Sequence, residues 1–240
     1  MIVELSTDTV DGALAADALG ADRVELCAAG ALGGLTPGPG LLAAALAGCT
    51  RTEVHVLVRP RDGGFRYAPA EVDAMLTDVR HAVAAGAAGV VIGALTASGA
   101  VDRPVVAELV AAAHGREVTF HRAIDVCADP VAALDVLAGL GVRRVLSSGQ
   151  APTALAGAPV LARLREVAGG RLTVMACGGI RPHNVREVVA ATGVRDVHAA
   201  PRTPAEPPRP GRVNSMDSVG FGAHATLDVA VARELVAALR

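Results

Sequence analysis

Short apolar segments alternate with longer segments of helical spacing along the chain, and this alternation repeats eight times. Runs rich in Val, Ile and Leu are typical of buried strands, whereas apolar residues three or four positions apart are typical of helices. The predicted strands span residues 2–6, 23–28, 53–60, 89–95, 117–122, 144–149, 172–180 and 196–200. Eight strand–helix units predict an α/β fold of the closed (β/α)8 TIM-barrel type, with an open doubly wound sheet as the alternative.

Proline and glycine mark the boundaries of the helices. Pro69 and Pro130 stand where the first turn of a helix tolerates a missing N–H group, so we predict helices over residues 69–85 and 129–140. Glycines just before strands can end a helix in the left-handed conformation. The chain has such glycines at Gly20, Gly86, Gly141 and Gly193.

A chain of 240 residues has the length of one barrel, so we expect residues 1–240 to form a single domain. Residues 201–224 depart from the pattern, because their five prolines exclude a helix or a central strand. This Pro-rich loop follows the eighth predicted strand. We therefore expect it at the carboxyl face of the barrel, either as a lid or as a solvated connection.

Composition narrows the classes of function. The net charge is −2 and aromatic residues make up 2% of the chain, which argues against binding to nucleic acid. No apolar run approaches the roughly 20 residues of a membrane span, and the N-terminus lacks the pattern of a secretory signal. We expect a cytoplasmic protein without nucleic-acid or membrane partners. Whether it acts alone or as a homodimer is left open.

The basic residues and the cysteines argue against two further kinds of site, a Schiff-base lysine and a close-paired cysteine motif. All 22 basic side chains are Arg, so no lysine amine is available for the Schiff base of an aldolase. The cysteines Cys27, Cys49, Cys127 and Cys177 stand far apart in the sequence and form none of the close pairs of zinc or redox motifs. We predict that they are free thiols.

The alternation within each strand predicts which side chains point into the barrel. Val54, Val56 and Val58 form an apolar row that should pack under the helices, which turns the opposite row toward the barrel axis. That opposite row consists of His55, Leu57, Arg59 and Arg61. In the other strands the same rule turns inward Glu4, Ser6, Arg23, Glu25, Cys27, Thr119, His121 and His198.

Ionised groups in a dry core are costly, so these residues must pair, bind water or face a ligand. A ligand is favoured near the carboxyl ends of the strands, where the active sites of barrels are built. Two other interpretations stay open. Glu4 and Arg59 could form a structural ion pair, and His55, which lies lower in its strand, could be a core histidine with satisfied hydrogen bonds.

Several candidate site residues stand at strand ends. His121, Arg122 and Asp125 combine cations with a carboxylate, which suits anion binding or acid–base chemistry. Turns that end two later strands could bring backbone amides toward an anion, although glycine is also common there for steric reasons. These turns contain Ser147, Ser148, Gly178 and Gly179.

Cys27 and Cys177 are candidates for a metal site. A thiol at a strand end is a soft ligand suited to Cu(I), whereas a buried free cysteine is more often a packing residue. Both interpretations stay open for Cys27, with Cys177 as a candidate second ligand.

Five short blocks of the sequence, taken in order, indicate a family resemblance. They are residues 20–27 (GADRVELC), 33–37 (GGLTP), 58–61 (VRPR), 118–123 (VTFHRA) and 144–149 (RVLSSG). In this order the blocks resemble the CutC family. The resemblance implies a barrel, a cytoplasmic location and a role in copper tolerance or trafficking. Members of that family often carry a cysteine where this chain has Ser6, a position proposed to ligate copper with the cysteine of the second strand.

Two functions follow from these residues and from the resemblance. The first is a copper homeostasis protein of the CutC type that binds copper through Cys27 and Cys177. The second is a metal-independent enzyme for a small anionic metabolite, which could carry a phosphate group, with acid–base chemistry at its centre. In that enzyme the catalytic groups would be His121, Glu25 and Asp125, and the ligand-binding residues would be Glu4, Arg59, Arg61, Arg122, Ser147, Ser148, Gly178, Gly179 and His198.

Overall fold

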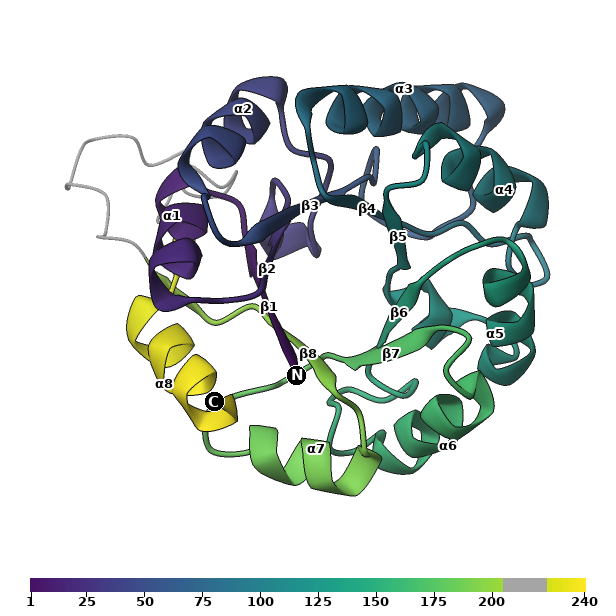
Figure 1. Cartoon of the computed structure of the whole chain (residues 1–240). Coiled ribbons are helices and arrows are strands. Elements are labelled where there is room, and N and C mark those ends of the chain that lie inside the picture. Colours follow the sequence, from purple (N-terminus) through teal and green to yellow (C-terminus); the bar gives the residue numbers. More distant parts are fainter. Residues whose placement is uncertain (205–223) are drawn as a thin grey trace, which may run out of the picture.

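The computed structural model describes residues 1–204 and 224–240, and it contains a closed barrel of eight parallel strands (Figure 1). The strands are β1 (Ile2–Thr7), β2 (Arg23–Leu26), β3 (Glu53–Leu57), β4 (Gly89–Ile92), β5 (Glu117–Phe120), β6 (Arg144–Ser147), β7 (Thr173–Ala176) and β8 (Asp196–Ala199). The barrel is closed because β1 pairs with β8 as well as with β2. This confirms the TIM barrel and excludes the open sheet.

In the described part of the chain, eight α-helices form a ring around the barrel (Figure 1). They are α1 (Val10–Leu19), α2 (Pro39–Gly48), α3 (Pro69–Ala85), α4 (Arg103–Ala112), α5 (Pro130–Gly139), α6 (Ala158–Ala168), α7 (Val185–Thr192) and α8 (Val229–Leu239). The predicted helix over residues 69–85 is confirmed, and Pro130 begins α5 as expected. Short 3-10 helices, η1 (Gly30–Leu32) and η2 (Arg122–Val126), follow β2 and β5 at the carboxyl ends of these strands.

The predicted alternation of side chains is confirmed. Val54, Val56 and Val58 belong to the large apolar core between the barrel and its helices. Inside the barrel, the apolar side chains form two smaller buried groups. One contains Cys27, Leu57 and Val91, and the other contains Leu146, Met175 and Cys177.

The amino end of the barrel is filled by a network of charged side chains that we call the amino-end network. It consists of Arg23, His55, Glu117, Arg144 and Asp196. Arg23 contacts His55 at 3.0 Å and Glu117 at 2.6 Å. Arg144 pairs with Asp196 at 2.8 Å and also contacts Glu117. His55 is fully buried in this network, which agrees with its interpretation as a core histidine.

The Pro-rich loop is described in part. Arg202–Pro204 form strand β9, which pairs antiparallel with β10 (Ala225–Leu227). The segment thus begins as a two-stranded ribbon outside the barrel, which corrects the expectation of a loop throughout residues 201–224. Residues 205–223, on which the choice between lid and connection depends, lie outside the described residues.

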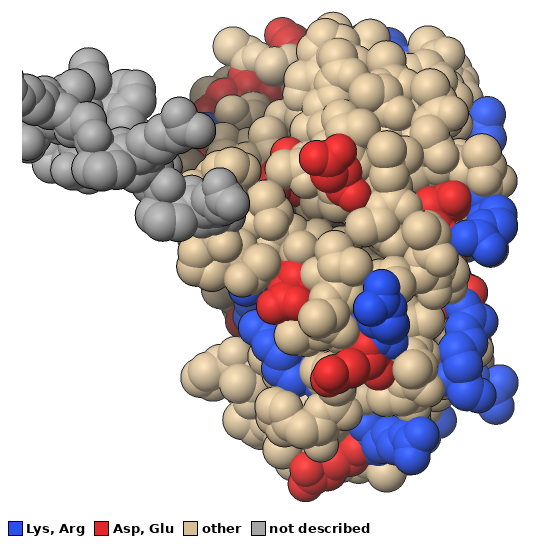
Figure 2. All heavy atoms as spheres, turned by 90° about the vertical axis from the view of Figure 1, so that its left-hand side faces the viewer, with Lys and Arg blue, Asp and Glu red and all other residues tan. Residues whose placement is uncertain are grey.

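The surface on the side of α1, α2 and α8 is shown in Figure 2. On this face, Arg and acidic side chains are interspersed in the lower half, and the upper part is largely uncharged. Among the described residues, no helix combines the length and apolar character needed to cross a bilayer.

Candidate functional site

A pocket of about 480 Å³ opens at the carboxyl ends of the barrel strands. A pocket of this size can hold a small metabolite or a solvated ion. It brings together predicted site residues from several strands and the loops that follow them. They are Glu25, Cys27, Arg59, His121, Arg122, Asp125, Cys177, Gly178, Gly179 and His198.

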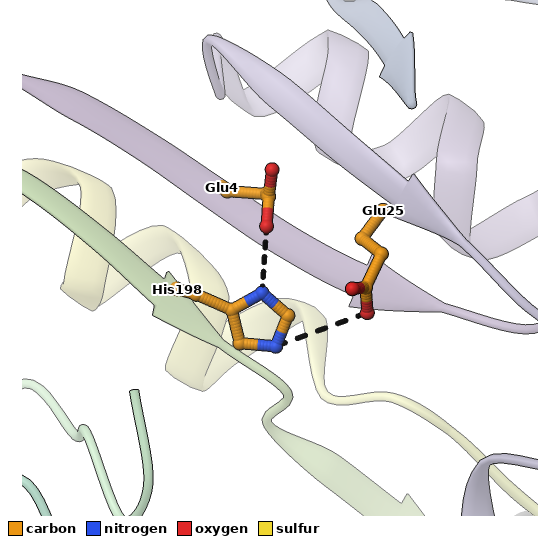
Figure 3. A group of neighbouring side chains, drawn as sticks. All are labelled: Glu4, Glu25 and His198. Atoms are coloured by element: carbon orange, nitrogen blue, oxygen red, sulfur yellow. Dashed lines mark hydrogen bonds and ion pairs between the residues drawn. The ribbon is translucent and has the colours of Figure 1, made fainter. Parts of the chain in front are cut away.

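Glu4, Glu25 and His198 form a compact group inside the barrel, which we call the floor cluster (Figure 3). They come from β1, β2 and β8, which are neighbours around the barrel. His198 Nδ1 lies 2.7 Å from Glu4 Oε1, and His198 Nε2 lies 4.0 Å from Glu25 Oε2. One ligand atom from each of the three residues lies within 4.8 Å of the others.

Burial and mutual charge set the protonation of the floor cluster. Burial favours a higher pKa for Glu4, but the hydrogen bond and charge of His198 outweigh it and lower the pKa below 4.5. Burial raises the pKa of Glu25, and the neighbouring Glu4 charge adds to the rise. Burial opposes protonation of His198, yet the charges of Glu25 and Glu4 raise its pKa above 6.5. Glu4 and His198 therefore form an ion pair beside a carboxyl group that holds its proton more tightly than usual.

His121 is neutral and held in one tautomer. Its Nδ1 accepts a hydrogen bond from the backbone N–H of Ala123 at 3.1 Å, so the proton of the neutral ring lies on Nε2. Burial, with the charge of Arg59, lowers the pKa of His121 to about 3. Nε2 is buried without a hydrogen-bond partner among the described residues. The Phe65 ring lies 4.7 Å from the imidazole, and a side chain at Gly93 would collide with it.

The two candidate metal-binding cysteines line the pocket in different surroundings. The Cys27 thiol donates to the Thr7 carbonyl at 3.5 Å and lies 3.8 Å from Ser6 Oγ. Burial raises the pKa of Cys27 to about 12, and the nearby Glu25 charge adds to the effect. Burial also raises the pKa of Cys177. Within the described residues, neither thiol belongs to a group of three or more metal-ligating side chains.

Asp125 is tied to the end of β6 rather than directed freely into the pocket. Its carboxylate accepts hydrogen bonds from Ser147 Oγ at 2.6 Å and from Ser148 Oγ at 3.0 Å. Arg122 Nε donates to the same carboxylate at 2.9 Å and its terminal nitrogen donates to Ser148 Oγ at 2.8 Å. Both serines are buried and absent from the pocket lining. This arrangement fixes η2 against β6 and orients Arg122 at the pocket.

The first of the two arginines that follow β3 joins two loops. Arg59 lines the pocket, and its guanidinium donates to the carbonyls of Leu32, Gly34 and Gly63, each at 2.9 Å. The ion pair that was an open interpretation for Arg59 and Glu4 does not form, because Glu4 contacts His198 instead.

Arg61 does not face the barrel axis, which corrects its predicted orientation. Its guanidinium pairs with Glu71 at 2.5 Å and lies 5.2 Å from the centre of the Tyr67 ring. Strict alternation of side chains ends with β3 at Leu57, so parity no longer predicts the direction of a residue four positions later.

Two pocket arginines were missed from the sequence. Arg181 and Arg202 both line the pocket, from the loop after β7 and from β9. Arg202 pairs with Asp8 at 2.7 Å. The position of Arg181 directly after the Gly178-Gly179 turn was a usable signal, because that turn ends a barrel strand. No comparable signal marked Arg202, because it stands in the Pro-rich loop, where no strand end was predicted.

Three comparisons relate the chain to known proteins. The profile described as CutC family matches residues 1–203. The family protein CutC of Bacteroides thetaiotaomicron is 45% identical over 199 residues, which cover 83% of this chain and 80% of the relative. That of Glaesserella parasuis is 38% identical over 243 residues, which cover 100% and 98%. A solved structure from Streptococcus agalactiae, described as a proposed copper homeostasis protein CutC, superposes with a TM-score of 0.78 at 30% identity, covering 82% and 97% of the two chains.

Proposed function

The chain belongs to the CutC family, and from that premise we propose that it is a copper homeostasis protein that binds copper in the pocket at the carboxyl face. The observation that carries the proposal is the set of donors in this pocket. Two thiols, an imidazole and a buried carboxyl group, from Cys27, Cys177, His198 and Glu25, line one space of about 480 Å³. Thiolates and imidazoles are the side chains that copper ions prefer.

Copper would have to displace the proton of Cys27, because a thiol binds metal as the thiolate. Burial holds the pKa of this thiol at about 12, so it is protonated at neutral pH. Copper binding through Cys27 should therefore weaken as the pH falls. The absence of disulfides among the four cysteines fits the cytoplasm, where we also place the protein.

An anaerobic titration with Cu(I) tests the proposal. We expect the wild-type chain to bind copper and Cys27→Ala to bind it at least about tenfold more weakly, because a soft ligand is lost. Cys49→Ala is the matched control, since Cys49 lies outside the pocket lining and should leave binding unchanged. Equal affinity of all three proteins would remove Cys27 from the site, and no binding by the wild type would contradict the proposal.

A second function is favoured by one specific observation. The Nε2–H group of His121 is a buried donor without a partner among the described residues, and Arg122 and Arg181 line the same pocket. A neutral imidazole donor can stabilise negative charge that develops on a substrate oxygen. Glu25, whose pKa burial raises, would transfer the proton. This combination suits an enzyme that acts on a small anionic metabolite.

Thermal unfolding with inorganic phosphate or oxalate tests this second function. A ligand at about ten times its Kd stabilises the folded chain by about 1.4 kcal/mol, which raises Tm measurably. We expect the shift to be lost in Arg181→Gln and kept in Arg163→Gln, a control whose exposed side chain pairs with Glu166 outside the pocket. No shift in the wild type with either anion would count against an anion-binding enzyme.

A further inference from the structure

We infer that the floor cluster of Glu4, Glu25 and His198 is a binding site for a divalent transition-metal ion, with His198 Nε2 and Glu25 as direct ligands. The inference rests on the proposed copper function and deepens it, because it names the donors and the oxidation state. It differs from a Cu(I) site at the cysteines, so the two can fail separately.

The geometry around His198 is that of an oriented metal ligand. Metal-binding histidines usually donate the N–H of their other ring nitrogen to a carboxylate, which fixes the ring and the tautomer. Glu4 Oε1 lies 2.7 Å from Nδ1 and serves this purpose, which leaves Nε2 to face Glu25. Figure 3 shows the imidazole between the two carboxyl groups.

The gap between the two proposed ligands matches an ion in size. Bonds from a metal to an imidazole nitrogen and to a carboxylate oxygen are each about 2.0–2.2 Å long. Their sum is close to the 4.0 Å between His198 Nε2 and Glu25 Oε2. An ion can therefore bridge the two atoms without a rearrangement of the strands, provided that the two ligands stand on nearly opposite sides of it.

A second observation is a buried carboxylate oxygen of the cluster that lacks a partner in the described part of the chain. Glu4 is 1% exposed, yet its Oε2 has no hydrogen-bond partner among the described residues. A buried carboxylate oxygen without a partner is costly. Arg23 is the neighbouring cation on β2. Its guanidinium contacts Glu117 and His55 in the amino-end network, and its Nη1 atom has no hydrogen-bond partner among the described residues. With a metal on neutral His198, the two carboxylates would balance the charge of a divalent ion.

The donor set selects the kind of metal. The two direct ligands, one imidazole and one carboxylate, are hard to borderline donors, whereas Cu(I) prefers thiolates and thioethers. For a nitrogen and oxygen site, affinity among first-row divalent ions is greatest for Cu²⁺.

Calorimetric titration of the full chain with Cu²⁺, together with electron paramagnetic resonance, tests the inference. We expect the wild type to bind a single ion with hyperfine structure from one imidazole nitrogen. His198→Gln should lower the affinity by about 100-fold and abolish that nitrogen signature. Glu4→Gln should lower the affinity by about 10- to 100-fold and keep the signature, because Glu4 orients the ligand. His81→Gln, at an exposed histidine, is the matched control.

Two outcomes would overturn the site. Either an unchanged affinity in both His198→Gln and Glu25→Gln, or loss of the ion in His81→Gln, would show that Cu²⁺ binds elsewhere. Glu25→Gln keeps the shape of the side chain, so it remains informative if the histidine variant does not fold. The Cu(I) titration separates the two proposals. Cu(I) binding that depends on Cys27, without Cu²⁺ binding, would reject the floor cluster and leave the copper function standing, whereas binding of neither ion would reject both.

Discussion

The two ends of the barrel both bury ionisable side chains from several strands, but they differ in whether these side chains find partners within the protein. At the amino end, Arg144 and Asp196 pair at 2.8 Å with exposed fractions of 9% and 7%, and Arg23 contacts Glu117 at 2.6 Å. These opposite charges compensate one another. At the carboxyl end, the floor cluster holds two acids and one histidine, and an oxygen of Glu4 is left without a partner among the described residues.

This difference distinguishes buried side chains that stabilise the barrel from buried side chains that are available to a ligand. Buried charges that find partners within the protein need no ligand to explain them. Buried donors and acceptors without partners are exceptions that call for water, an ion or a substrate. Apart from one nitrogen of Arg23 and the Thr119 hydroxyl, such atoms in the described part of the barrel interior lie near the pocket, on Glu4, Arg59 and His121. We therefore take the carboxyl end as the functional face.

The largest effect is expected from breaking the amino-end network. Arg144→Met leaves the buried Asp196 without its partner, and removal of one member of a buried ion pair costs about 3–5 kcal/mol. Urea unfolding at neutral pH measures the loss. The double variant Arg144→Met with Asp196→Asn should recover part of it. A loss below about 1 kcal/mol would show that this network does not hold the barrel together.

A smaller, pH-dependent effect is expected from His198→Gln in the floor cluster. The charges of Glu25 and Glu4 raise the pKa of His198 above its usual 6.5. The protonated ring therefore stabilises the folded state fully below pH 6.5, and this contribution is lost as the pH rises through the folded-state pKa. The free energy of unfolding should differ more between wild type and variant at about pH 6 than at about pH 8. A difference that grows with pH would contradict the assigned charges.

The pKa values of the two pocket histidines, His121 and His198, are shifted in opposite directions from the usual value. Burial lowers the pKa of His121 to about 3, so its ring should stay neutral as the pH falls toward about 4 while His198 carries its proton. Nitrogen-detected NMR of the imidazoles can show both the charge and the Nε2–H tautomer. A protonated His121 at about pH 5 would remove the neutral donor on which the enzyme alternative depends.

The smallest effect is expected from Arg61→Gln. Its guanidinium contacts Glu71 and the Tyr67 ring and does not line the pocket. Copper affinity and the thermal shift with phosphate should both equal those of the wild type. A weakened response to either ligand would return Arg61 to the set of ligand-binding residues.

Much of the fold and part of the site could be predicted from the sequence. Strand parity placed Glu25, Cys27, His121 and His198 inside the barrel, because alternation is strict within a regular strand. The pairing of Glu4 with His198 could not be predicted, since β1 and β8 meet only when the barrel closes. Parity also failed for Arg61, which lies beyond the end of β3. Loop positions such as Arg202 depend on chain paths that no periodic pattern encodes.

The roles of the predicted site residues remain predictions. The structure shows which contacts these residues already make. Asp125 bonds to Ser147 and Ser148, so the expected roles of these three residues in catalysis and ligand binding would need these bonds to open. Gly178 and Gly179 line the pocket with φ angles of 92° and 67°, a conformation that favours glycine. The expected approach of their amides to an anion stays a prediction.

The most direct test of the functional face is a crystal structure of the chain soaked in Cu²⁺, with anomalous scattering recorded at the copper edge. We predict one strong peak between His198 Nε2 and the Glu25 carboxylate, at about 2.0–2.2 Å from each, with Glu4 still bonded to Nδ1. Peaks only at surface histidines, with the floor cluster empty and the His198 to Glu4 contact unchanged, would contradict this prediction.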